Sequence, residues 1–191
     1  LMAPEKRYAK QQGKLKLLVV GGSLGAAALN DVLPKALAQL SPDERPVVIH
    51  QAGEKHIEAL KHNYQAAGVQ ADTKAFIHNM AEVYAWADVV ICRAGALTVA
   101  ELACVGVASV LVPFPFAVDD HQTTNGRYLA DNGAAILVQQ SAFDVAKATV
   151  ILRSFTREKC LSMAINAKKL AQPDATTTVA KICMECAFTG A

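Results

Sequence analysis

The residues of this chain that could do chemistry gather between positions 88 and 125. Two apolar runs lie in that stretch. The first is followed by Gly95, Thr98 and Glu101, and the second by His121, Gln122 and Asn125. A helix that begins on such a turn offers free backbone amides to an anion, and a carboxylate can accept hydrogen bonds from two neighbouring hydroxyls. Side-chain amides can donate to sugar hydroxyls and accept from them. This combination favours a ligand with both phosphate and sugar, and a nucleotide-sugar site is the leading hypothesis.

Two glycine turns are candidates for binding the phosphates. The first, Gly21-Gly-Ser23-Leu-Gly25, follows an apolar run at 14–20 and begins a helix, where Ser23 could donate its hydroxyl to the same anion. It lacks the GxGxxG spacing, the next predicted strand leads to Gln51 instead of an acidic residue, and no GK[ST] follows. A dehydrogenase and a P-loop enzyme are therefore disfavoured. A tight structural turn capped by Ser23 stays open as the alternative.

The second turn, at Gly95, precedes a predicted helix that carries Glu101. Thr98 and the first amides of that helix could meet an anion, and Glu101 lies a turn further on, where it suits two ribose hydroxyls. A solvated glutamate is the alternative. Phe76 and Ile77 stand where a strand gives way to a helix, so they could stack on a base and recognise its edge. Core packing is the alternative for both.

Apolar runs and glycine turns predict the elements that must hold these residues. Strands are predicted at residues 14–20, 46–50, 69–76, 88–92, 108–112 and 134–138. Helices are predicted from the first glycine turn to residue 40, at 54–67, 79–87, 97–105 and 121–132, and in the tail at 143–188. This alternation argues for an α/β fold, a three-layer, doubly wound, mostly parallel sheet of about six strands. Pro34 predicts a kink or an early stop in the first of these helices, and Asn30 and Asp31 are placed on its polar face.

Composition limits the other possibilities. With 52% apolar residues, 19% charged residues and a net charge of +2, the chain is globular and gives no global electrostatic case for nucleic acid. The five cysteines are odd in number, as in a reducing compartment, and Cys183 and Cys186 form a lone CxxC for which a redox or metal role is the minor alternative. Asp119 and Asp120 have no further ligand at suitable spacing, so neither a metal nor a cofactor is predicted.

The start of the chain is basic, with a single glutamate among five cationic residues: Lys6, Arg7, Lys10, Lys14 and Lys16. A solvated linker is the simple interpretation, and contact with an anionic membrane is the alternative. The apolar stretch at 89–118 is interrupted by charges and prolines, so a membrane-spanning helix is not expected there.

Four motifs in order, GGSLGA, FIHNM, DVVICRAGALTVAE and PFPF with the later DHQ and Asn125, resemble the C-terminal half of a MurG-type glycosyltransferase. Enzymes of this family add N-acetylglucosamine to lipid I and so make lipid II of bacterial peptidoglycan. The resemblance implies a two-domain GT-B fold whose C-terminal, Rossmann-like half holds the donor, UDP-N-acetylglucosamine. It implies a linker at residues 1–13 from an N-terminal domain that is missing here. Residues 14–191 would then be the donor-binding domain with its C-terminal helices.

The resemblance also implies roles for individual residues. Ser23 would contact the donor diphosphate, and Ile77 would recognise the uracil edge through its backbone, with Phe76 packing near the ring. Glu101 would bind the ribose hydroxyls, and Gln122 would hold the N-acetylglucosamine. The other residues expected to bind the diphosphate and ribose or to line the sugar loop are Gly95, Ala96, Leu97, Thr98, Val99, Ala100, His121 and Asn125.

In such enzymes the catalytic residues, the acceptor loop and a basic, apolar membrane patch belong to the N-terminal half. The resemblance thus implies an inverting, metal-independent N-acetylglucosaminyltransferase of cell wall biogenesis, cell shape and cell division, of which this chain alone is inactive. The full-length protein would be cytoplasmic and peripheral on the inner face of the cell membrane. Its partners would be UDP-N-acetylglucosamine and the acceptor domain that binds lipid I, with no nucleic acid. Two alternatives stay open: the nucleotide-sugar-binding domain of another GT-B enzyme, and a non-catalytic donor-binding subunit of a split glycosyltransferase.

Overall fold

The structure is a computed structural model that describes residues 2–22 and 26–189. In this part of the chain six strands form one sheet in the order β3-β2-β1-β4-β5-β6, and every neighbouring pair is parallel. The strands are β1 (Lys16–Val20), β2 (Val47–Gln51), β3 (Asp72–Lys74), β4 (Val89–Cys92), β5 (Ala108–Leu111) and β6 (Ala135–Leu137). This strand order confirms the predicted doubly wound α/β fold.

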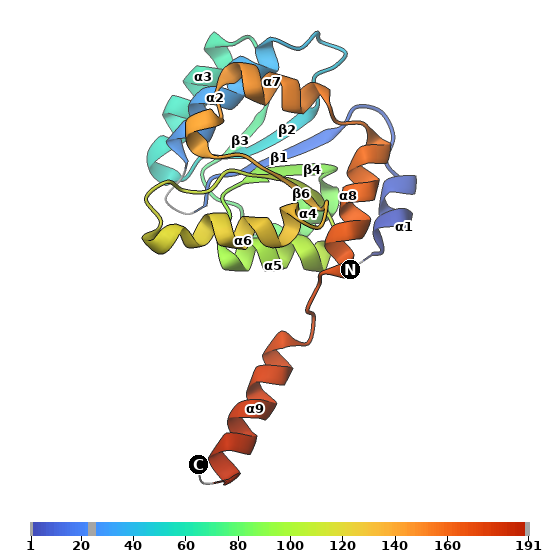
Figure 1. The fold of residues 1–191 in the computed structure, drawn as a ribbon. Coiled ribbons are helices and arrows are strands. Elements are labelled where there is room, and N and C mark those ends of the chain that lie inside the picture. The colour runs from blue at the N-terminus through green and yellow to red at the C-terminus, as the bar shows by residue number, and fades with distance from the viewer. Residues whose placement is uncertain (1, 23–25, 190–191) are drawn as a thin grey trace.

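Helices cover both faces of the sheet, which makes three layers (Figure 1). One face carries α2 (Ala27–Ala38), α3 (Ile57–Ala66, after the 3-10 turn η1 at Glu54–His56) and α7 (Val145–Arg153, after η3 at Gln140–Ala142). The other face carries α4 (Met80–Trp86), α5 (Ala96–Val105) and α6 (His121–Ala130, after η2 at Val118–Asp120). Beside the sheet, α1 (Pro4–Ala9) packs on α8 (Arg157–Lys169), and α9 (Ala175–Thr189) extends away from the body.

Alternation along the strands divides the core between the two helical layers. In β1, Leu17 and Val19 belong to the cluster formed with α2, α3 and α7, whereas Leu18 and Val20 belong to the cluster formed with α4 and α5. All four side chains are at most 8% exposed. A strand that is buried on both faces must be apolar at nearly every position, which is why the central strands stand out in the sequence as continuous apolar runs.

Two predictions about α2 need correction. An early stop at Pro34 is wrong, because the helix continues past it to Ala38, while a kink there stays a prediction. Asn30 is not on a polar face, because it is only 4% exposed and its Oδ1 lies 3.0 Å from Nε2 of the fully buried His50. The other ring nitrogen of His50 lies 2.9 Å from the hydroxyl of Tyr64. This buried chain of hydrogen bonds joins α2, β2 and α3, and the helical period of α2 alone gives no sign of it.

The basic start of the chain is not a solvated segment throughout. Arg7 and Tyr8 are buried, and Nη2 of Arg7 donates to the carbonyl of Gly106 over 2.6 Å. The guanidinium also lies over the Tyr8 ring, 4.9 Å from its centroid. Lys6 and Lys10 remain exposed. A short helix with one buried face therefore belongs to this domain, while the assignment of residues 1–13 as a linker to another domain stays a prediction.

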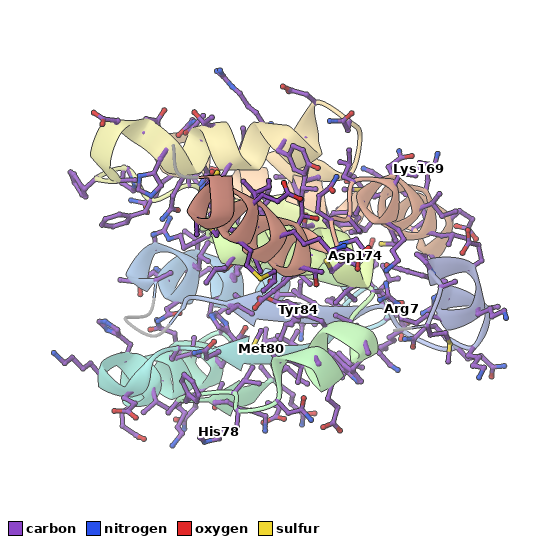
Figure 2. The ribbon with its side chains drawn as sticks, turned by 90° about the horizontal axis from the view of Figure 1, so that it is seen from below. Arg7, His78, Met80, Tyr84, Lys169 and Asp174 are labelled. Atoms are coloured by element: carbon purple, nitrogen blue, oxygen red, sulfur yellow. The ribbon has the colours of Figure 1, made fainter. Side chains whose placement is uncertain are left out.

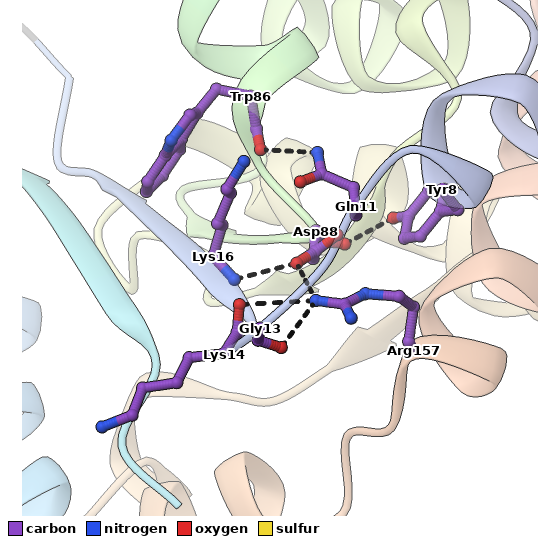
Figure 3. Close-up of polar contacts among 8 residues, drawn as sticks. All are labelled: Tyr8, Gln11, Gly13, Lys14, Lys16, Trp86, Asp88 and Arg157. Carbon is purple, nitrogen blue, oxygen red and sulfur yellow. Dashed lines mark hydrogen bonds and ion pairs between the residues drawn. The ribbon is translucent and has the colours of Figure 1, made fainter. Parts of the chain in front are cut away.

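A buried carboxylate ties the start of the chain to its last third (Figure 3). Asp88, just before β4, is fully buried, and its Oδ2 accepts from the backbone amide of Lys16 over 2.9 Å. The same oxygen lies 3.4 Å from Nη2 of Arg157, at the beginning of α8, and the hydroxyl of Tyr8 donates to the backbone carbonyl of Asp88. A buried charge is tolerated only when it is paired and hydrogen-bonded, so these contacts hold α1, β1, β4 and α8 in one arrangement.

The last helix stands apart from this packing. Side chains at residues 175–187 are exposed, and Cys183 and Cys186 are among them. Among the helices that the structure describes, none has the length and apolar character needed to cross a membrane.

The glycine that ends α5 generates a first prediction. Gly106 has φ +70°, and a Cβ there would lie 2.9 Å from Cγ of Pro4 and 3.0 Å from Cβ of Lys168, whereas Gly68, after α3, has φ +63° and open space. We expect Gly68→Ala to lower the free energy of unfolding by about 1 kcal/mol through backbone strain alone. Gly106→Ala should cost about 1–3 kcal/mol more, because α1 and α8 must shift. Urea unfolding measures both losses, and equal losses would contradict a tight junction of α1, α5 and α8.

The buried histidine generates a second prediction. Burial lowers the pKa of His50 from 6.5 to about 3. The folded state therefore binds the proton more weakly than the unfolded state, so the stabilisation is complete above pH 6.5 and is lost as the pH falls toward 3. Between neutral pH and about pH 5 this one residue should remove about 2 kcal/mol from the free energy of unfolding.

Urea unfolding of the wild type and of His50→Gln at the two pH values tests this prediction. On acidification, the free energy of unfolding of His50→Gln should fall by about 2 kcal/mol less than that of the wild type. His62→Gln provides the control, since it removes an imidazole that is exposed and lies outside the core. An unchanged pH dependence in His50→Gln would show that the buried imidazole does not resist protonation.

Candidate functional site

The order of the strands reverses at the centre of the sheet, where β1 has β2 on one side and β4 on the other. The chain leaves β1 toward α2 on one face and leaves β4 toward α5 on the opposite face. Doubly wound folds bind ligands in the crevice that opens at the carboxyl ends of two such strands. Gly21 and Gly22 follow β1 at this place, and residues 93–95 follow β4. Ser23 lies outside the described residues, so its contact with a diphosphate stays a prediction.

The helix after β4 begins at the predicted turn with its first amides open. Gly95 is the N-cap residue of α5 and supplies no side-chain hydrogen bond, and its carbonyl accepts from the amide of Val99 over 2.9 Å. The amides of residues 96–98 have no partner within the helix, and with the helix dipole they favour an anion. By contrast, α7 and α8, away from the crevice, are capped by the side chains of Asp144 and Thr156.

The side chains of α5 divide the predicted residues into two kinds. Ala96, Leu97 and Ala100 are exposed, with Leu97 81% accessible, and Thr98 is half-buried next to the turn. Val99 is only 5% exposed and packs in the core. A ligand at this helix could therefore meet Val99 only through its backbone.

Glu101 is exposed, but it is not a freely solvated side chain. Its Oε2 accepts a hydrogen bond over 3.2 Å from the hydroxyl of Tyr84, a residue of α4 that is only 2% exposed. Burial, with a contribution from the charge of Glu101, raises the pKa of Cys92 to about 12. Because α5 begins four residues after the end of β4, its first two turns, which include Glu101, lie near the carboxyl end of that strand.

The loop that was predicted to recognise a base lies next to Tyr84 and Glu101. Ile77 is 6% exposed and shares a core cluster with Tyr84, so its side chain packs as the alternative interpretation proposed. Phe76 is 47% exposed, its ring lies edge-on to that of His78, and His78 points outward (Figure 2). The side chain of Asn79 caps α4. Recognition of a base by the Ile77 backbone and the Phe76 ring stays a prediction.

The loop between β5 and α6 holds the remaining predicted residues. The backbone amide of Phe114 donates to Oε1 of Gln122 over 2.9 Å, so the oxygen of Gln122 is engaged and its amide nitrogen is left to donate to a ligand. Nδ2 of Asn125 donates to the carbonyl of Ala94 over 3.2 Å, which ties α6 to the turn after β4. His121 is the first residue of α6 and is exposed.

Arg93 was not among the predicted site residues, yet it joins the turn after β4 to the loop after β5. Its Nη1 donates to the carbonyls of Val112 and Pro113 over 3.1 Å each, and its Nη2 donates to Oε1 of Gln140 over 2.6 Å. The guanidinium lies 5.5 Å from the ring centroid of Phe114. Burial lowers the pKa of Arg93, but a guanidinium stays protonated and adds a positive charge beside the turn at Gly95. The sequence could have indicated Arg93 by its position. A charged residue directly after a buried parallel strand lies at the carboxyl end of the sheet, where doubly wound folds bind ligands.

The acidic pair before α6 lies in a strained turn. Asp119 and Asp120 both have φ 50°, a strained value for a residue with a side chain, and Oδ1 of Asp120 accepts from the hydroxyl of Thr123 over 2.7 Å. Among the residues that the structure describes, no three His, Cys, Asp or Glu side chains lie close enough together to hold a metal ion.

A hollow of about 990 Å³ lies at the opposite, amino-terminal end of β1 to β3. Its basic lining residues already have partners: Lys14 donates to a backbone carbonyl, Arg45 to the carbonyls of Leu37, Ala38 and Leu40, and Lys61 pairs with Glu58. These contacts satisfy the cations within the protein. The carboxyl ends of the strands, where open amides and a positioned carboxylate meet, are the better candidate site.

Comparison with known proteins identifies the family of this chain. The profile of the Glycosyltransferase family 28 C-terminal domain matches residues 16–184. The UDP-N-acetylglucosamine--N-acetylmuramyl-(pentapeptide) pyrophosphoryl-undecaprenol N-acetylglucosamine transferases of Paraburkholderia xenovorans and Burkholderia mallei are each 58% identical to the chain, over 186 and 184 residues. These matches cover 95% and 94% of the chain but 50% of each relative, so the chain spans about half the length of those relatives.

Solved structures agree. MurG of Acinetobacter baumannii has a TM-score of 0.90 at 41% identity, covering 96% of this chain and 53% of that one. WaaG, a glycosyltransferase involved in lipopolysaccharide biosynthesis, has a TM-score of 0.67 at 19% identity over 94% of this chain and 49% of its own, which is a likeness of fold alone. The resemblance to MurG-type enzymes that the motifs indicated is confirmed, and the chain belongs to glycosyltransferase family 28, whose C-terminal domain it contains.

Proposed function

We propose that this chain is the donor-binding half of an N-acetylglucosaminyltransferase that converts lipid I to lipid II. It binds UDP-N-acetylglucosamine in the crevice between β1 and β4. The observation that carries the proposal is the pairing of an open helix start at Gly95 with a held carboxylate at Glu101, six residues further along α5. The 58% identity to transferases named for this reaction supports the choice of donor and acceptor.

Each part of the donor has a matching group. The amides at the start of α5 and the charge of Arg93 bind the diphosphate, and Glu101 accepts from the ribose hydroxyls. The loop at Phe76 and Ile77 receives the uracil. The amide nitrogen of Gln122, whose oxygen is already bonded to the Phe114 amide, donates to the N-acetylglucosamine.

The same groups serve the chemistry as well as the binding. The acceptor hydroxyl of lipid I attacks the anomeric carbon from the face opposite to UDP, so the configuration inverts and the bond to the diphosphate breaks. Negative charge then grows on the leaving diphosphate, where the amides and dipole of α5 and the guanidinium of Arg93 stabilise it. These fixed charges take the place of a metal ion in the proposed mechanism.

The rest of the reaction depends on the half that this chain does not contain. The relatives are about twice as long, and we assign to their other half the acceptor site for lipid I, the catalytic base and the main membrane contact. Catalysis requires the acceptor to be held against the donor, so this chain alone binds the donor without turnover. We propose that the whole protein is peripheral at the cytoplasmic face of the cell membrane.

Nucleotide specificity tests the proposal directly. Calorimetric titration should show binding of UDP-N-acetylglucosamine and of UDP, and the binding should persist in the presence of a chelator because the fixed charges replace a metal. TDP- and GDP-sugars should bind at least roughly tenfold more weakly. Thymidine adds a 5-methyl group and lacks the 2′-hydroxyl that Glu101 would accept from, and guanine is larger and presents different hydrogen-bonding groups to the base loop. Preference for TDP- or GDP-sugars would instead identify another kind of GT-B donor domain, and failure to bind UDP would remove the site altogether.

Replacing the ribose-binding carboxylate gives a second test. Glu101→Ala should weaken UDP binding by about 1–3 kcal/mol, because the ribose hydroxyls lose their charged acceptor. Glu58→Ala, which removes the same charge from the far face on α3, should leave the affinity unchanged. Equal affinities for wild type and Glu101→Ala would show that Glu101 is only a surface residue.

A further inference from the structure

We propose that Tyr84 is the positioning residue of the ribose site: it holds Glu101 in the orientation that accepts the two ribose hydroxyls. The inference rests on the proposed function, because it concerns the same donor site. It concerns a residue on α4 that lies outside all four motifs used to identify the site, 17 positions before the carboxylate that it contacts.

The contact is between a fixed group and a flexible one. Tyr84 is only 2% exposed and packs in the core cluster with Ile77 and Val99, whereas Glu101 is exposed. The phenol ring is therefore immobilised by packing, and its hydroxyl reaches Oε2 of Glu101 over 3.2 Å. A glutamate side chain without such a partner would sample several rotamers in solvent.

The direction of the hydrogen bond is also fixed. Burial, followed by the charges of Cys92 and Glu101, raises the pKa of Tyr84 above its ordinary value of 10.0. The hydroxyl thus stays protonated at physiological pH and donates, while the carboxylate accepts. A carboxylate has about four lone-pair sites, so one bond to Tyr84 leaves the others for two ligand hydroxyls.

The position of Tyr84 links two parts of the site. It lies on α4, which is capped by Asn79 directly after the loop with Phe76 and Ile77. Figure 2 shows Met80 and Tyr84 on the inner side of α4, whereas His78 points away from the body. One short helix thus carries the proposed base loop at its beginning and the residue that orients the ribose carboxylate near its end.

Tyr84→Phe removes a single oxygen and tests this role. The probes are UDP and dideoxy-UDP, which lacks both ribose hydroxyls, titrated into wild type, Tyr84→Phe and Glu101→Ala. The wild type should prefer UDP. Tyr84→Phe should weaken UDP binding roughly two- to tenfold and have little effect on dideoxy-UDP, because the variant loses only the preorganisation of the Glu101 side chain. In Glu101→Ala the further change Tyr84→Phe should have no additional effect on the preference, since the two residues act as a pair.

Tyr64→Phe is the matched control, because Tyr64 is also buried and its hydroxyl is bonded, but to His50 on the other face of the sheet. It should lower stability as Tyr84→Phe does and leave the preference for UDP intact. If Tyr84→Phe weakens both nucleotides equally, or neither, the positioning role is wrong. If the wild type binds both nucleotides equally, the ribose role of Glu101 fails, and with it that of Tyr84. Failure of the wild type to bind UDP at all would overturn the proposed function before any variant is compared.

A second measurement needs no variant. Side-chain couplings of Glu101 in the isotope-labelled wild type, without nucleotide, should report one dominant rotamer. Rotamer-averaged couplings would contradict the proposed role.

Discussion

The reversal of strand order between β1 and β4 is the constraint on which the rest of the site depends. Because the chain leaves these neighbouring strands toward opposite faces, their carboxyl ends are not covered by the helices that follow. The first amides of α5 therefore stay open beside the crevice. At the other end of the same strands, the paired and buried carboxylate of Asp88 fixes β4 against β1 and α8. The end of the sheet that these contacts fix is thus separate from the end that we propose binds the donor.

The loops around the crevice are tied to each other before any ligand arrives. Asn125 joins α6 to the carbonyl before Gly95, and Arg93 joins the turn after β4 to the end of β5 and to Gln140. Binding groups whose own positions are locked by such secondary contacts lose little entropy when the ligand binds. We infer that the diphosphate and sugar parts of the donor site are preformed as one unit.

Much of the fold followed from local patterns in the sequence, and the tertiary contacts did not. Continuous apolar runs and glycine turns place the strands and the positions of Gly95 and Glu101, because these signals act within a few residues. The contacts that were missed join distant residues: 17 positions separate Tyr84 from Glu101, 47 separate Arg93 from Gln140, and 69 separate Asp88 from Arg157. No periodicity within one helix reports such partners, and the same reason explains why Asn30 was wrongly placed on a polar face.

The location of the donor site is the central claim, and a chemical-shift titration tests it most directly. The isotope-labelled chain would be titrated with UDP-N-acetylglucosamine while its backbone amides are followed. We predict that the largest shifts fall on Gly22, on the first turn of α5 after Gly95 and on the loop that carries Gln122. Shifts gathered instead around Arg45 and Asp72, in the hollow at the amino ends of the strands, would contradict the account.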